Sequence, residues 1–444
     1  MRLTDIILFP LYVYILNLIF TARRNKIEDP VLKFYHKYAF WVKIISTLAI
    51  TIFNVYISLG DSTTLYFTEG HGLFKLILDD FSKIQWLFVE GKDFSQDLIT
   101  DSYNRGYFNS EANFFIIRIV AIFSFFTFGH YLLINLFFSM IAFTGIWKLF
   151  RFFYDIYPHL HKKIALAILF LPTVVFWSSG ALKDPICMGM LGWMTYAIYH
   201  GFYKKTNTLT NGIISIIAIW VLSIVKPYIL FSYLPFFILY MLLINIHLIK
   251  SSFIKAIMVV FISALAVGGF ILMSDKLQEE MGSFALEKLT ESIQNQQNNF
   301  INMADKAESS FSLGVEYDGS LSSLLKIAPA AINATLFRPY LWESKKISTL
   351  LSSLESLTLM LFTLFVLYKA GIRFFLVTLV KDPMVMFCFL FSILFALFIG
   401  ATTLNFGTLV RYKIPCMPFF IMALILINED RKIKKTASQK EAVV

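Results

Sequence analysis

The sequence predicts an all-α protein that crosses a membrane many times, and its composition is the first reason. Of its 444 residues, 57% are hydrophobic and only 15% are charged, and the mean hydropathy is +0.68. Water-soluble domains contain about 45–50% apolar and about 25% charged residues. A soluble chain with 48 Phe and 21 Tyr would have more apolar surface than it could bury. We therefore expect a polytopic integral membrane helical bundle.

The apolar stretches are the second reason. A helix needs about 17–25 mostly apolar residues to span a bilayer, and about 11–12 segments qualify. These segments are 4–20, 40–59, 113–129, 131–149, 163–179, 186–203, 211–225, 228–249, 253–273, 348–368, 384–402 and 413–428. We therefore expect one transmembrane domain over residues 1–428, followed by a basic tail over 429–444.

The charges in the connecting segments predict the orientation. Residues 60–112 contain nine acids and four bases, and residues 274–347 are long and polar. The shorter loops and the C-terminal tail are rich in Lys and Arg, which is typical of cytoplasmic segments. We therefore expect the two large loops outside the cytoplasm and the C-terminus inside.

This orientation leaves room for only one crossing between residues 113 and 149. That stretch nevertheless holds two apolar segments, divided at Gly129-His130. One of them is then re-entrant or lies in the outer interface, and such a segment is stable only where protein or a water-filled cavity covers it. The alternative is a true hairpin that locally breaks the charge rule.

Polar residues that interrupt the apolar runs are the candidates for function, and most of them fall on the predicted outer side. A charge near membrane depth costs several kcal/mol unless it is paired or hydrated, so such residues are functional candidates. They are Asp61, Trp177, Lys183, Asp184, Lys226, Tyr228, Arg338, Glu343, Glu355, Arg411 and Lys413. Their placement on one leaflet argues against an ion channel, whose determinants would line a pore.

Several candidates also have a purely structural interpretation. Asp61 could end a helix in a turn, and the Lys226 side chain could extend to the outer headgroups. Glu355 could form a buried structural pair with Arg338 or Lys183.

The paired charges in two outer turns leave similar alternatives. Lys183 and Asp184 could form an interfacial ion pair, with Asp184-Pro185 starting a helix. Arg411 and Lys413 are bases on a side where the charge rule expects few, which favours phosphate binding.

Several kinds of protein are excluded or disfavoured. The sequence has no P-loop, G-x-S-x-G or H-E-x-x-H motif. Cys187, Cys388 and Cys416 lie within or beside apolar runs, so we interpret them as core residues. The net charge of +10 comes from short clusters between apolar runs, so no nucleic-acid partner is expected. No motif indicates a metal site, and a divalent ion such as Mg²⁺ or Mn²⁺ stays open as a cofactor.

The layout resembles the GT-C superfamily of membrane glycosyltransferases. The resemblance lies in the first large, acidic outer loop, which begins with Asp61-Ser62-Thr63-Thr64-Leu65-Tyr66, and in the many spans that follow. It implies a sugar donor linked to polyprenyl phosphate, a site on the outer side and a catalytic acid at Asp61. The chain departs from the family in its additional first helix at 4–20. It also lacks an evident D-x-D or E-x-D pair.

Two outer turns are similar to segments of bacterial polytopic proteins linked with surface polysaccharide. They run from Trp177 to Asp184 and from Arg411 to Pro415. The similarity implies a multi-pass protein of the bacterial inner (cytoplasmic) membrane, with its active site facing the periplasm or exterior.

Together these features predict a transferase that moves a sugar from a lipid-linked donor to a glycan, lipid or protein acceptor. Asp61 would be the general base, and the outer bases would bind the donor phosphate: Arg411, Lys413 and Arg338, with Lys226 and Lys183 in reserve. Glu355 and Asp184 would orient these bases, with Glu343 in support, and Trp177 and Tyr228 could stack on a sugar. The alternatives are an O-antigen polymerase or ligase-like enzyme and a flippase or transporter for lipid-linked sugars.

Overall fold

The chain is built from helices, as the sequence predicts. The computed structural model describes residues 2–57, 60, 62–89, 110–245, 253, 257, 311, 313, 321–344, 347–403 and 405–441. Within these ranges every regular element is a helix. Seven helices are long and apolar enough to cross a membrane, and a bent pair near the C-terminus would be an eighth. The prediction of a multi-pass helical membrane protein is therefore confirmed.

The chain divides into two compact units, Met1–Pro227 and Tyr228–Val444. Unit 1 contains helices α1 (Asp5–Asn25), α2 (Pro30–Ile52), α3 (Thr68–Asp79), α5 (Glu111–Thr127), α6 (Tyr131–Ile156), α7 (His161–Ile168), α8 (Pro172–Trp177), α9 (Lys183–Ile198) and α10 (Thr208–Val225). Unit 2 contains α11 (Pro227–Asn245), α15 (Leu321–Phe337), α16 (Ile347–Ala370), α17 (Ile372–Lys381), α18 (Pro383–Thr402), α19 (Phe406–Tyr412) and α20 (Met417–Glu441). Short π or 3₁₀ turns lie at Phe53–Ile57, Ser62–Phe67, Phe81–Leu87, Pro158–Leu160, Tyr199–Tyr203 and Leu341–Glu343.

An Asp-Pro pair starts one spanning helix in each unit. The Asp29 carboxylate accepts hydrogen bonds from the backbone N–H groups of Val31 (2.8 Å) and Leu32 (3.4 Å). Asp382 caps α18 in the same way. The following Pro has no N–H to leave unsatisfied and already has a helical φ, so the pair defines where the helix begins.

The centre of unit 1 is a close contact between α6 and α9. A Cβ added to Gly145 would lie 1.9 Å from the carbonyl oxygen of Gly189, and one added to Gly192 would lie 1.9 Å from the carbonyl oxygen of Gly145. Only glycine permits backbones to approach this closely, and small residues at helix contacts are common in membrane proteins. This contact positions the start of α9, which belongs to one of the two clusters described below.

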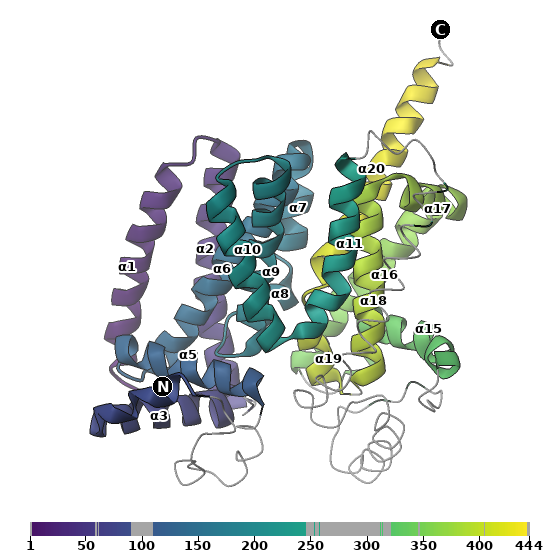
Figure 1. Ribbon diagram of the computed structural model, residues 1–444. Helices are drawn as coiled ribbons and strands as arrows, with labels where there is room; N and C mark the ends of the chain where they lie inside the picture. The colour runs from purple at the N-terminus through teal and green to yellow at the C-terminus, as the bar shows by residue number, and fades with distance from the viewer. Residues whose placement is uncertain are drawn as a thin grey trace. The chain divides into compact units, whose positions relative to one another are not determined.

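Only one of the two segments between residues 113 and 149 runs through unit 1. Tyr131, at the start of α6, receives a hydrogen bond from Asn54 (3.2 Å) and bonds Ser62 (2.7 Å) just beyond α2. Helix α5 is attached to this same end of the unit, because Tyr66 donates to Asn113 near its start. Figure 1 shows α3 and α5 lying across the lower ends of the upright helices. This arrangement, in which α6 is long enough to span a membrane and α5 lies across its end, agrees with the expected single crossing, and the crossing itself stays a prediction.

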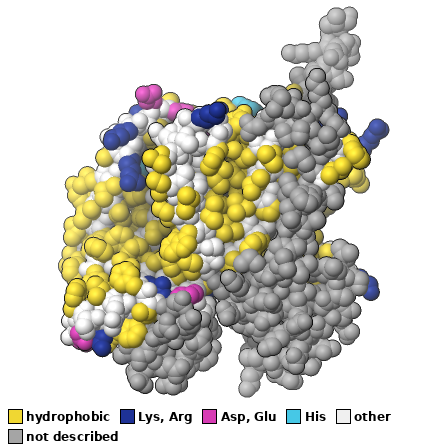
Figure 2. Space-filling model, in the orientation of Figure 1, with side chains coloured by type: hydrophobic (Ala, Val, Ile, Leu, Met, Phe, Trp, Pro, Cys, Tyr) yellow, Lys and Arg dark blue, Asp and Glu magenta, His cyan; other side chains and the backbone are white. Residues whose placement is uncertain are grey.

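The two ends of unit 1 differ in charge. The end opposite α3 and α5 carries basic residues from several connections: Arg23, Arg24, Lys26, Arg151, Lys162, Lys163, Lys204 and Lys205. Figure 2 shows hydrophobic side chains over the upright helices and several Lys and Arg side chains at the upper edge. The positive-inside rule assigns the end richer in Lys and Arg to the cytoplasm. For this protein that assignment stays a prediction.

Candidate functional site

Some of the residues predicted for function lie outside the described ranges. Asp61, the predicted general base, is one of them, as are most of the apolar segment 253–273 and most of the predicted outer loop 274–347. The role of Asp61 therefore stays a prediction. Eight of the other ten candidate residues fall into two clusters, one within each unit, whereas Tyr228 and Arg411 lie outside both. Each cluster is described by itself.

The first cluster lies at the end of α15 in unit 2 and is organised by Arg338. The Arg338 guanidinium forms a forked ion pair with Glu343, with Nε–oxygen distances of 3.0 and 3.1 Å. Glu343 also accepts a hydrogen bond from the backbone N–H of Tyr340 at 2.8 Å. The carboxylate therefore fixes the short helical turn and the orientation of the arginine together.

Aromatic rings surround the same arginine. Its Cζ atom lies 4.4 Å from the ring centroid of Phe311 and 5.2 Å from that of Phe406. Tyr340 stacks on Trp342 with a centroid distance of 4.9 Å, and 80% of the Trp342 surface is exposed. An arginine among rings is stabilised by cation–π contact, and the exposed indole offers a flat apolar face beside it.

Lys413 connects the arginine to α16. Its Nζ donates to the Arg338 carbonyl oxygen (3.2 Å) and to the Ser356 hydroxyl (3.0 Å), and the residue is fully buried. The neighbouring Glu355 interacts with it electrostatically. Residues far apart in the sequence thus meet at one place, which we call the Arg338 centre: Phe311, Arg338, Tyr340, Trp342, Glu343, Glu355, Ser356, Phe406 and Lys413.

The Arg338 centre differs in detail from the sequence interpretation. Arg338 and Lys413 were both expected to bind phosphate, and they do lie together, but Lys413 is enclosed while Arg338 lies nearer the surface. Arg338 has its forked pair with Glu343, five residues away, and Glu355 lies near Lys413. The half-buried Arg411 places its guanidinium 5.2 Å from the ring of Tyr412.

One further candidate of unit 2 serves in packing. Tyr228 is buried, with 5% of its surface exposed, and packs against Phe395 at a centroid distance of 5.9 Å. A buried ring in such a contact is a core residue, so stacking of Tyr228 on a sugar gains no support from this position.

The second cluster lies in unit 1 and is built on residues 178–184, the irregular turn between α8 and α9 together with the first two residues of α9, which we call the buried turn. The sequence suggested a short turn on the outer face, yet every residue of it is buried. Asp184 accepts a hydrogen bond from Lys226 at 2.5 Å, and the two side chains are 1% and 4% exposed. Lys183 is also buried, while the Trp177 ring lies at the start of the turn, 6.0 Å from Phe53. Non-helical backbone at membrane depth has to be covered by protein in this way.

Lys43 is the charged residue of this cluster that the sequence analysis did not identify. It lies halfway along the spanning segment Pro30–Ile57 and is only 3% exposed. Its Nζ donates to the Ser178 carbonyl (2.7 Å), the Ser178 hydroxyl (2.8 Å), the Ser179 hydroxyl (2.7 Å) and the Val175 carbonyl (3.3 Å). A lone lysine inside the apolar segment 40–59 was the available signal, because charge at that depth is costly and usually functional.

The polar side chains of α2 and α6 extend the cluster along the helix. Thr47, Thr51 and Asn54 follow Lys43 at helical spacing and are buried on the same face of the segment. Asn135 of α6 donates to Thr51 (2.9 Å) and accepts from the backbone N–H of Ala181 (2.8 Å). The buried turn thus has hydrogen-bond partners on both neighbouring helices.

The remaining site predictions concern metals and cysteines. Among the residues that the structure describes, no three His, Cys, Asp or Glu side chains are grouped to hold a metal ion. Cys187, Cys388 and Cys416 are free and buried, which confirms their interpretation as core residues.

Comparison with family models, curated proteins and solved structures finds no match for this sequence. The function therefore has to be inferred from the two clusters. The Arg338 centre offers a held cation, carboxylates and an exposed ring, whereas the buried turn offers enclosed lysines within the span.

Proposed function

We propose that the protein is a membrane glycosyltransferase that moves a sugar from a polyprenyl-phosphate donor to an extracytoplasmic acceptor in assembly of a cell-envelope glycan. The observation that carries the proposal is the Arg338 centre, where an arginine held by a carboxylate lies next to a stacked aromatic pair whose Trp342 ring is exposed. Arginine suits phosphate, and an indole suits the apolar face of a sugar ring. The apolar helices place the protein in a membrane, where a lipid-linked donor resides.

The reaction places specific demands on these groups. The acceptor hydroxyl oxygen bonds to the anomeric carbon while the bond from that carbon to the phosphate oxygen breaks. The electron pair leaves with the polyprenyl phosphate, whose negative charge increases, and a carboxylate takes the hydroxyl proton. Arg338 would stabilise the leaving phosphate, and the resemblance to the GT-C superfamily implies that Asp61 is the base.

Glu343 would act by orientation. It holds the Nε edge of Arg338 before any substrate is present. A cation that is already fixed does not have to reorganise when charge develops on the leaving group, which is the condition for electrostatic catalysis.

The test is donor consumption by the purified full chain in lipid, supplied with a panel of polyprenyl-phosphate sugars and an acceptor and followed by mass spectrometry. Arg338→Lys keeps the charge but loses the fork, and we expect it to lower turnover about 100- to 1,000-fold. Trp342→Ala should weaken substrate binding about two- to tenfold, and Asp61→Asn should abolish transfer. Arg373→Lys, on the exposed surface of α17, is the matched control.

Three results would contradict parts of the proposal. Retained activity in Asp61→Asn removes the base assignment, and full activity in Arg338→Lys removes the phosphate site. Absence of turnover by the wild type with every monophosphate donor favours the polymerase or ligase reading, which the same assay examines with glycans on polyprenyl diphosphate.

A transporter of lipid-linked sugars is the second candidate, and Lys43 is the observation that favours it. Transporters place charged residues near the middle of their spans, where the substrate passes, and Lys43 has this position. Proteoliposomes with a lipid-linked sugar in one leaflet separate the two functions. Transport moves the intact lipid without an acceptor, whereas transfer requires the acceptor and consumes the donor.

A further inference from the structure

An open groove in unit 1 lies beside the N-terminal half of α1, apart from both clusters. Its volume is about 470 Å³, within the range of roughly 300–1,000 Å³ typical of ligand pockets. Residues of α1, α2 and α6 line it, with Arg2 and Leu3 just before α1: Arg2, Leu3, Asp5, Ile6, Phe9, Pro10, Leu48 and Leu132. Apart from Arg2 and Asp5, this lining is apolar.

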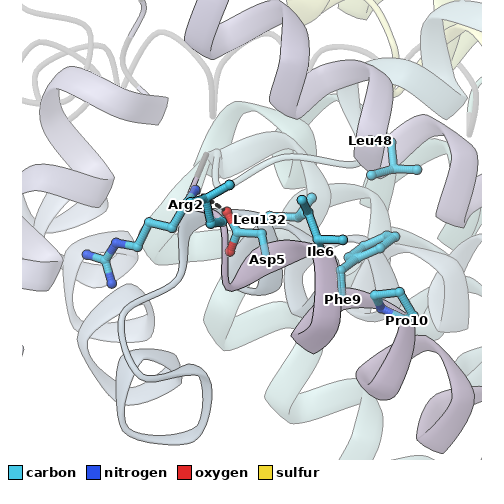
Figure 3. Close-up of a pocket in the computed structure, with 8 residues that line it drawn as sticks. Arg2, Asp5, Ile6, Phe9, Pro10, Leu48 and Leu132 are labelled. Atoms are coloured by element: carbon cyan, nitrogen blue, oxygen red, sulfur yellow. Dashed lines mark hydrogen bonds between the residues drawn. The ribbon is translucent and has the colours of Figure 1, made fainter.

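The groove is polar at one end and apolar along its length. Figure 3 shows the Arg2 side chain directed away from Ile6, Phe9 and Pro10, so the cation lies at the rim and the apolar residues lie further along. From Asp5 to Pro10 helix α1 rises by about 7.5 Å, and Arg2 lies beyond its first residue. A charged head followed by an apolar chain of that length is the shape of a membrane lipid.

The rim of the groove carries more than one positive charge. Arg2 and the exposed Lys75 of α3 both act electrostatically on His71, so each of the two cations lies within electrostatic range of that ring. Burial lowers the pKa of the His71 ring, and the charges of Lys75, Arg2 and His130 lower it further. The rim therefore has an excess of positive charge, and an anion there would relieve it.

The nearest carboxylate of the lining is already engaged. Asp5 accepts a hydrogen bond from the Arg2 backbone N–H at 2.7 Å and contacts His130 Nδ1 at 2.6 Å. It is only 5% exposed. Asp5 therefore holds the start of α1 in place through the Arg2 backbone and His130, and these two contacts do not use the Arg2 guanidinium.

We propose that this groove binds one anionic glycerophospholipid, with its phosphate at Arg2 and Lys75 and an acyl chain along Phe9, Pro10 and Leu48. The groove opens to the outer surface of unit 1, since its lining residues Leu3 and Ile6 are 86% and 71% exposed. In a membrane these surfaces contact bulk lipid, which makes a bilayer phospholipid the occupant. The proposal is independent of the transferase activity, because no residue of the Arg338 centre takes part.

The experiment measures lipid retained by the purified full chain in neutral detergent, using native mass spectrometry. The probes are phosphatidylglycerol, phosphatidylcholine with the same acyl chains, and inorganic phosphate. We expect phosphatidylglycerol to bind best. Each rim charge contributes about fivefold to binding of an anionic surface, so Arg2→Gln/Lys75→Gln should weaken retention about 25-fold. Ile6→Trp, at an exposed position, should fill the groove and reduce retention without disturbing the fold.

The matched control is Lys26→Gln/Lys162→Gln, which removes the same charge from exposed positions at the opposite end of unit 1. It should leave retention unchanged. Equal loss in this control, or equal binding of phosphatidylcholine, would overturn the selection by charge. Equal binding of inorganic phosphate, or unchanged retention in Ile6→Trp, would overturn the placement of the chain in the groove.

Discussion

Two buried lysines hold the two ends of the buried turn in unit 1, and their charges are stabilised in different ways. Lys43 and Lys226 are equally buried, each with 3% of its surface exposed. Lys226 donates to the Asp184 carboxylate at 2.5 Å. Lys43 donates to uncharged oxygens, including the hydroxyls of Ser178 and Ser179. One end of the turn is therefore held by an ion pair and the other by several neutral acceptors.

The comparison shows that equal burial does not imply equal dependence on a partner. Removing Lys226 leaves a buried carboxylate without its cation, and an uncompensated buried charge is strongly destabilising. Removing Lys43 leaves neutral groups that have other bonds, since the Ser179 hydroxyl also donates to the Val175 carbonyl at 2.7 Å. The two lysines should therefore respond very differently to the same substitution.

The largest expected effect is that of Lys226→Met. We expect the free energy of unfolding to fall by about 3–5 kcal/mol, because the buried Asp184 carboxyl loses the Lys226 ammonium that it pairs with. The double variant Asp184→Leu/Lys226→Met should recover most of this loss, since it removes both charges. Unfolding in mixed detergent micelles, followed by far-UV circular dichroism, measures both. A double variant as unstable as the single one would refute the ion pair as the cause.

A smaller effect is expected for Lys43→Met. Its loss removes one hydrogen bond from each of these neutral oxygens, and we expect a cost of about 1–3 kcal/mol. Ser179→Ala removes one of several acceptors and should cost about 0.6 kcal/mol, the average for side-chain hydrogen bonds within membranes. Ser223→Ala on the exposed face of α10 is the control and should change nothing. If Lys43→Met costs as much as Lys226→Met in the same unfolding assay, the distinction between the two ends is wrong.

The sequence was sufficient for the helical membrane class because hydropathy is a property of the chain read in order. It overestimated the number of spans, with about 11–12 expected where the described residues hold seven helices long enough to cross, or eight with the bent pair. The expectation that only one of the two segments between residues 113 and 149 crosses agrees with the arrangement of α5 and α6. The sequence also placed Arg338 and Lys413 together, because bases and aromatics near the ends of spans are chemically unusual. These inferences depend on the hydropathy and charge of single segments, and those properties do not change with the helices that a segment packs against.

The pairings between side chains could not be predicted because they depend on which helix faces meet in the folded protein. Lys226 meets Asp184 over 42 residues, and Lys43 meets Ser178 over 135. The spacing of Lys43, Thr47, Thr51 and Asn54 defines a polar face on one helix. It does not identify the partner, and the partner determines whether that face is a binding site or a structural contact.

Among the substitutions that remove a charge, the smallest effect is expected at Asp29, an acid of the same unit that lies at the start of α2. Partial burial alone would raise the pKa of the Asp29 carboxyl, but hydrogen bonds from Tyr154, Val31 and Leu32 bring it below its ordinary value. Such a carboxylate adds stability above its unfolded pKa of about 4, and loses that contribution as the pH falls through the lower folded value.

Asp29→Ala should therefore cost about 1 kcal/mol at pH 7, the usual value of a helix N-cap, and progressively less in acid. Asp382→Ala removes the other Asp-Pro cap and is the matched comparison, because its cap accepts the same two kinds of backbone bond. Unfolding of the wild type and both variants between pH 7 and pH 3 measures the difference. If Asp29→Ala lowered stability as much as Lys226→Met, burial would not explain why the two acids, Asp29 and Asp184, differ. If its cost were the same at every pH, the lowered pKa of Asp29 would not be the source of its contribution.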